Sequence, residues 1–69
     1  MVYVFKTSIS SQMKAKTLNK HLEEIKEIEQ WNFDLEDCDN ILRIVADKLD
    51  TTNIINLLTS FGFDCKELD

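Results

Sequence analysis

The side chains best suited to bind a ligand lie close to the N-terminus, where serines and lysines are concentrated between residues 8 and 20. Residues 1–22 contain four lysines and no Asp or Glu, whereas residues 23–69 contain all thirteen acids. Hydroxyls and free backbone N–H groups at the start of a helix bind anions, and nearby lysines strengthen that attraction. The expected ligand is therefore a small anion or a carboxylate of an acidic partner protein. The candidate binding residues are Ser8, Ser10, Ser11, Lys14, Lys16 and Lys20.

The charges of the expected first helix run against its macrodipole. Lys14 and Lys16 lie near its start, and Glu23, Glu24 and Glu27 lie near its end. A helix favours the opposite arrangement by about 0.3–1 kcal/mol for each charge. Local violations of this kind gather at functional sites. The alternative is a solvated, lysine-bearing surface with ordinary capping serines, because exposed charge costs little.

The remaining candidate metal ligands are isolated from one another. Cys38 and Cys65 fall on different expected elements that are not neighbours, so neither a disulfide nor a shared metal site is expected. Cys65 is expected to pack as a small hydrophobe. His21 has no second ligand three or four residues away, which favours a half-buried packing role. The sequence leaves open whether Met13, His21, Cys38 or Cys65 takes part in binding a metal.

Acidic residues crowd one expected hairpin but lack the pattern of a calcium loop. Asp34, Glu36, Asp37 and Asp39 have neither the spacing nor the glycine of an EF-hand, so a solvated turn is expected. The sequence also lacks a glycine-rich phosphate loop and a local Cys-His pair. We therefore expect no enzyme and no cofactor.

The composition indicates one small domain over residues 1–69. Hydrophobic residues make up 43% and charged residues 30% of the chain, which is not a disordered composition. No apolar run approaches the ~18 residues of a membrane span, and no signal pattern appears, so a cytoplasmic protein is expected. A net charge of −5 argues against nucleic-acid binding, which depends on neutralising phosphates.

The N-terminal half predicts a strand followed by an amphipathic helix. β-branched and aromatic residues over residues 2–9 favour a strand. Ser10 or Ser11 is placed to cap the helix. The inward strand positions are Tyr3, Phe5, Thr7 and Ile9. The buried helix positions are Ala15, Leu18, Leu22 and Ile25, with a spacing that continues toward Ile28.

The C-terminal half predicts two further strands, a helix and a last strand. Apolar and polar residues alternate over residues 30–36, and residues 41–46 return as a strand with Leu42, Ile44 and Ala46 inward. Asp50 or Thr51 caps a helix whose apolar positions are Ile54, Leu57, Leu58 and Phe61. Gly62 stands where a left-handed C-cap is needed, before a strand over residues 63–68. The order β-α-β-β-α-β predicts a ferredoxin-like α+β fold, with two helices on one face of a four-stranded antiparallel sheet.

With its elements in place, the chain resembles the heavy-metal-associated domain family of small copper chaperones and metal-pump modules. That family carries a Gly-Met-x-Cys-x-x-Cys loop after its first strand. Its glycine falls on Ser8, its methionine on Ile9, and its two cysteines on Ser11 and Lys14. The helix positions that follow, Ala15, Leu18 and Leu22, match without a gap. Asp34-Leu35 and Gly62-Phe63 resemble further short features of the family.

The resemblance implies the family's fold without its metal chemistry. Paired thiolates hold a soft cation such as Cu(I), whereas Ser11 offers a neutral hydroxyl and Lys14 an ammonium that cannot coordinate a metal. Chaperones of this family dock partners through the same loop and helix. The resemblance therefore favours a non-catalytic adaptor that docks an acidic partner or a small anion. Two alternatives remain: a metal carrier with unorthodox ligands, and a purely structural homo-oligomer with the basic front of one copy against the acidic hairpin of the next. The chain is expected to be a monomer or a weak homo-oligomer.

Overall fold

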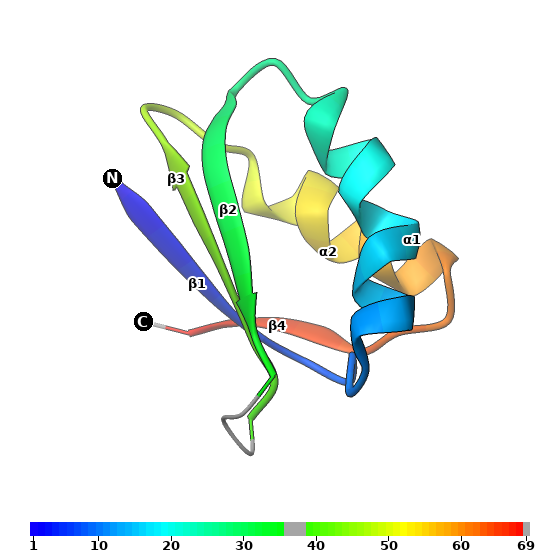
Figure 1. Cartoon of the computed structure of the whole chain (residues 1–69). Helices are drawn as coiled ribbons and strands as arrows, with labels where there is room; N and C mark the ends of the chain where they lie inside the picture. Colours follow the sequence, from blue (N-terminus) through cyan, green and yellow to red (C-terminus); the bar gives the residue numbers. More distant parts are fainter. Residues whose placement is uncertain (36–38, 69) are drawn as a thin grey trace.

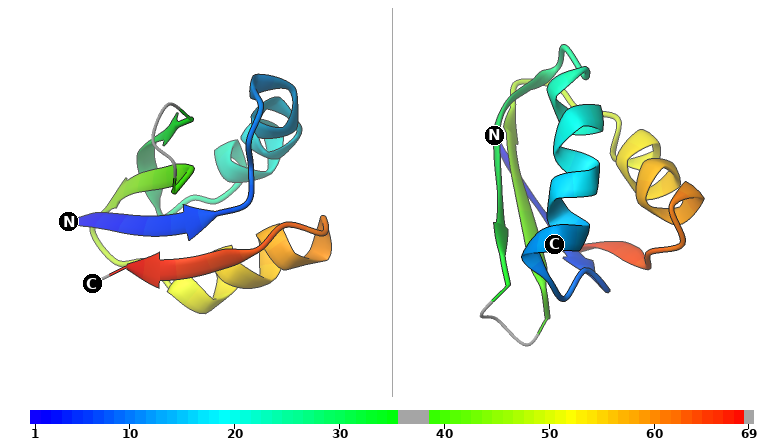
Figure 2. Two further views of the ribbon diagram at one scale, coloured as in Figure 1. Left: turned by 90° about the horizontal axis from the view of Figure 1, so that it is seen from below. Right: turned by 45° about the vertical axis from the view of Figure 1, so that its right-hand side comes forward.

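The computed structural model describes residues 1–35 and 39–68 (Figure 1). Within these residues the elements are β1 (Val2–Thr7), α1 (Gln12–Glu23), β2 (Ile28–Asp34), β3 (Ile41–Ala46), α2 (Thr51–Ser60) and β4 (Cys65–Leu68). The strands form one antiparallel sheet in the order β2-β3-β1-β4. Both helices lie on the same face of that sheet (Figures 1 and 2). The predicted ferredoxin-like α+β fold is therefore confirmed.

The core lies between the helices and the inner face of the sheet. On β1 the buried residues are Phe5 and Thr7, as their alternation predicts, and Phe5 lies opposite Leu42 of β3. The continuous buried cluster consists of Phe5, Ile9, Ala15, Leu18, Leu22, Leu42, Ile44, Ala46, Ile54 and Leu58. Burying side chains of this size stabilises a fold by about 1.5–3 kcal/mol each. Both helices therefore hold the sheet through most of the predicted positions, but the prediction was wrong for Ile25, which follows the end of α1, and for Phe61, which is 39% exposed.

The helix ends use the capping residues that the sequence indicates. Ser11 accepts a hydrogen bond from the backbone N–H of Lys14 at 3.2 Å, and Asp50 accepts one from Thr52 at 3.1 Å. Gly62 follows α2 with a φ of 85°, a backbone conformation that favours glycine. None of the described helices is long and apolar enough to cross a membrane.

Several predicted boundaries differ from the structure. The predicted helical spacing toward Ile28 is wrong, because α1 ends at Glu23 and Ile28 begins β2, opposite Ala46. An apolar residue three positions after Ile25 suits a helix and a strand equally well, and pairing with β3 decides between them. β1 ends at Thr7, two residues earlier than predicted, and β4 starts at residue 65, two residues later. β2 ends at Asp34, and the predicted end at residue 36 lies outside the described residues.

Candidate functional site

The loop between β1 and α1 is anchored to the rest of the molecule by Thr7. The Thr7 hydroxyl donates to the backbone oxygen of Asn40 at 2.7 Å and accepts from the backbone N–H of Ile9 at 3.1 Å. Thr7 is buried although it is polar. Because both bonds are made within the chain, this hydroxyl positions the loop and does not face a ligand.

The candidate serines are partly engaged in the same anchoring. The Ser8 hydroxyl accepts from the backbone N–H of Asp64 at 2.8 Å, and the Ser8 N–H donates to the Asp64 oxygen at 3.1 Å. Ser11 is the α1 cap, and Ser10 is exposed. Sequence reasoning missed Asp64, which lies 56 positions from Ser8. The contact between Ser8 and Asp64 follows from the topology, because the antiparallel pairing of β1 with β4 brings the end of β1 to the start of β4.

The three candidate lysines are exposed along α1 but do not converge on one point. Successive helix residues are rotated by about 100°, so Lys14 and Lys16 lie on opposite sides of the helix. Lys16 and Lys20, four residues apart, share one side. Over residues 1–35 and 39–68, the ion pairs involve Lys6 and Arg43 and none of these lysines. The arrangement is a broad basic surface rather than a closed anion site.

Met13 belongs to this surface, although the sequence suggested only a weak metal ligand. Its side chain is 80% exposed, which is unusual for a large apolar residue. Met13, Lys16 and Lys20 follow the i, i+3, i+7 spacing, so they form one stripe on the solvent side of α1. We use the name basic face for the exposed side chains Met13, Lys14, Lys16 and Lys20, in which Lys14 lies to one side of the stripe formed by the other three. The basic face combines one apolar side chain with three cationic ones.

Among the described residues, Cys65 and His21 both pack against other side chains. Burial raises the pKa of the Cys65 thiol to about 11, and this side chain packs against the core as predicted. His21 is half-buried as predicted, and its ring lies 4.7 Å from the ring of Phe61. Cys38 lies outside the described residues. In the part of the chain that the structure describes, no three His, Cys, Asp or Glu residues are grouped to hold a metal ion.

Two acids of the β2–β3 hairpin contact basic residues of the sheet. Asp34 lies 3.5 Å from Arg43, and Asp39 lies 3.4 Å from Lys6. These pairs are well exposed and contribute little stability. Glu36 and Asp37, the other acids of the expected turn, lie outside the described residues.

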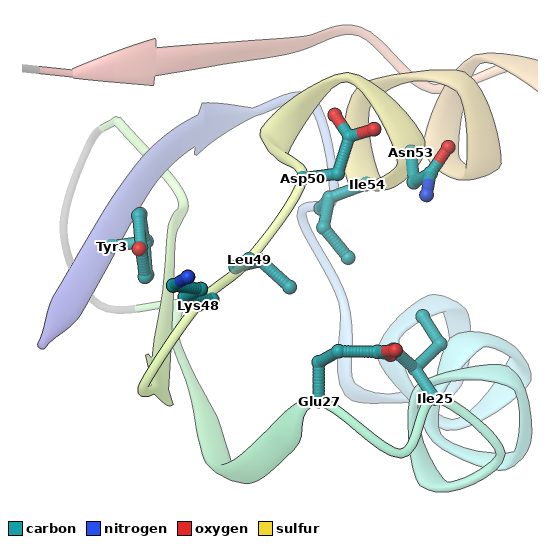
Figure 3. Close-up of a pocket in the computed structure, with 8 residues that line it drawn as sticks. All are labelled: Tyr3, Ile25, Glu27, Lys48, Leu49, Asp50, Asn53 and Ile54. Carbon is teal, nitrogen blue, oxygen red and sulfur yellow. The ribbon is translucent and has the colours of Figure 1, made fainter.

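A cavity of about 510 Å³ opens between the end of α1 and the start of α2 (Figure 3). Its apolar lining consists of Tyr3, Ile25, Leu49 and Ile54, and its polar lining of Glu27, Lys48, Asp50 and Asn53. The Asp50 carboxylate already caps α2. No Ser, Cys or His lines this cavity.

A second cavity, of about 430 Å³, lies beside β1 and β4 near the anchored loop. Ser8 and Cys65 both line it, together with Lys6 and Lys66. The high pKa of the Cys65 thiol leaves little thiolate at neutral pH, so this sulfur is a poor nucleophile.

Comparisons with protein-family models, with curated proteins and with solved structures find no match to this chain.

Proposed function

We propose that this chain is a non-catalytic docking module that binds an acidic segment of a partner protein through the basic face of α1. The observation that supports this proposal is the exposed positive charge of that face, whose lysines form no ion pair among residues 1–35 and 39–68. Three exposed lysines surround exposed Met13 on a molecule with a net charge of −5. Charge complementarity of this kind steers association and selects partners. An exposed apolar group among polar ones is typical of interaction surfaces.

The geometry favours an acidic protein segment over a small anion. A small anion requires donors that converge on one point. The hydroxyls of Ser8 and Ser11 accept backbone N–H groups within the chain, and the lysines spread along and around α1. An extended segment with several carboxylates matches such a surface better than a single phosphate does. Met13 favours a segment that also carries an apolar side chain.

The resemblance to heavy-metal-associated domains is part of this proposal. At the two positions where that family has cysteines, Ser11 caps α1 and Lys14 is exposed. Chaperones of that family dock partners through the same loop and helix, so a docking surface can persist after the thiolates are lost. No specific observation favours a metal-carrying function, which stays a prediction.

The test is a titration of the protein into a fluorescent peptide composed of Glu and Leu at low ionic strength. The variant Lys14→Gln/Lys16→Gln/Lys20→Gln removes the three charges with a residue of similar helix propensity. Three exposed charge pairs contribute about 0.2–1 kcal/mol each. We therefore expect the affinity to fall about tenfold, which corresponds to about 1.4 kcal/mol. Added salt should weaken wild-type binding by screening.

The matched control is Lys26→Gln/Lys48→Gln/Lys66→Gln. It changes the net charge by the same amount at three exposed lysines outside the basic face. The control should bind the peptide with an affinity close to that of the wild type. Equal losses of affinity in the two variants would mean that the peptide responds only to net charge, and would contradict the proposed docking surface.

A further inference from the structure

The two edges of the sheet differ in how they are protected against pairing with another chain. β4 is four residues long and carries exposed Lys66 and Glu67. β2 is seven residues long, and its central residues 30–33 have no charge and no proline. Edge strands present unpaired backbone groups, and short length, charge and proline are the usual ways to block them. The centre of β2 is therefore open to pairing.

The helix beside this open edge, α1, carries charges that complement those of a second copy of α1 in antiparallel orientation. The Trp31 indole on β2 donates to the Asn19 side-chain oxygen on α1 at 3.2 Å, so Asn19 lies on the β2 side of the helix. Gln12, Lys16 and Glu23 lie along this side by helical spacing, with Lys16 at the border with the solvent-facing stripe of Met13 and Lys20. The stripe is thus basic toward one end, neutral at Asn19 and acidic at the other end. Two such stripes in antiparallel orientation place Lys16 of each copy toward Glu23 of the other.

We propose that a second copy of this chain pairs with β2 in antiparallel orientation and joins the two sheets into one. Asn32 then lies opposite Asn32 of the second copy on a two-fold axis. Gln30 lies opposite Asp34 of the second copy, and Trp31 lies opposite its Phe33. This register uses residues 30–34 and leaves the irregularity between Ile28 and Gln30 outside the paired segment.

The register is favourable at each position. Asn32 and Gln30 are exposed and uncharged, so no like charges meet at the centre of the joint. Trp31 and Phe33 are only half-buried in the single chain, and each gains an aromatic neighbour across the joint. Paired strands lie about 4.8 Å apart and packed helices about 8–10 Å apart, so the two α1 helices can meet above the joined edges.

The joined sheet would place both α1 helices on the same side. Their solvent-facing stripes, with Met13 and Lys20, then form one surface that a single acidic partner can contact twice. Linked binding sites raise the effective concentration of the second contact. This consequence rests on the proposed function, whereas the pairing of β2 does not depend on it.

The test is the concentration dependence of the solution mass, measured by sedimentation for the wild type and for Asn32→Lys. The new lysines would face each other on the axis, so we expect a wild-type dimer and an Asn32→Lys monomer. The matched control Asn56→Lys makes the same change at an exposed position on α2 and should stay dimeric. A wild type that stays monomeric at every accessible concentration, or an Asn32→Lys variant that still dimerises, would overturn the proposal.

A second variant keeps the proposal testable if the lysine disturbs folding. Cross-strand neighbours have Cβ atoms about 4.5–5.5 Å apart, close to the separation that a disulfide needs. Mild oxidation of Asn32→Cys should give a covalent dimer whose linked peptides, read by mass spectrometry, both contain position 32. Linkage through other cysteines only would overturn the register. The Asn32→Lys monomer should still bind the Glu/Leu peptide, so failure of pairing and failure of docking are separate results.

Discussion

The two helices cover the same face of the sheet with very different surfaces. α2 has no charged side chain over its whole length, whereas α1 carries Lys14, Lys16, Lys20 and Glu23. Both helices begin at a capping side chain and bury a short apolar stripe. α2 therefore shows that a helix can hold this sheet without surface charge. The charges of α1 are therefore not required to hold the sheet, and docking is the role that we propose for them.

The largest effect is expected from truncating a buried leucine, because both helices bury leucine side chains in the core. Leu18→Ala on α1 and Leu58→Ala on α2 each delete a fully buried side chain. Each variant should lower the free energy of unfolding by about 2–5 kcal/mol, measured by urea denaturation. Similar losses would support equal structural roles. A loss below about 1 kcal/mol for Leu18→Ala alone would show that α1 is not held by its core stripe.

A smaller change in stability is expected from a substitution at the start of α1. Lys14 stands three residues after the cap Ser11, where a glutamate would complete a capping box with that serine. Lys14→Glu should therefore raise the free energy of unfolding by about 0.3–1 kcal/mol, because it also complements the helix dipole. Thermal and urea unfolding measure this gain, with Lys26→Glu outside the helix as the control. A loss of stability would mean that Lys14 supports the fold.

A third effect, expected only at alkaline pH, lies on β4, against which α2 packs. Burial raises the pKa of the Cys65 thiol from its ordinary value of 9.0 to about 11 in the folded chain. The unfolded chain loses this proton first as the pH rises, so the free energy of unfolding should fall between pH values of about 9 and 11. Denaturation of the wild type and of Cys65→Ala over this range measures the difference. The same pH dependence in both proteins would contradict the assigned burial.

The fold could be predicted from the sequence because local patterns and tertiary packing agree. Phe5 and Thr7 alternate on β1, Ser11 and Asp50 stand at helix starts, and Gly62 supplies the positive φ. Ile28 was assigned wrongly because its spacing suits a helix as well as a strand, and only its pairing with Ala46 decides.

The candidate site was less predictable because its geometry depends on distant contacts. The six predicted binding residues could be chosen from their types, but the contacts that they make within the chain could not be predicted. Ser8 is held by Asp64, which is remote in sequence. Met13 was considered only as a weak metal ligand, although the predicted buried positions Ala15, Leu18 and Leu22 already put it on the solvent side of α1. The open edge at β2 likewise requires the strand order, which puts β3 and β1 between the two edges.

The most direct test of the account measures stability and docking on the same variant, Lys14→Gln/Lys16→Gln/Lys20→Gln. If the charges of α1 serve docking, its free energy of unfolding should stay within about 0.5 kcal/mol of the wild type, because exposed lysines contribute little to stability. Its affinity for the Glu/Leu peptide should fall about tenfold. A large loss of stability with unchanged peptide affinity would contradict the account and assign these lysines to the fold.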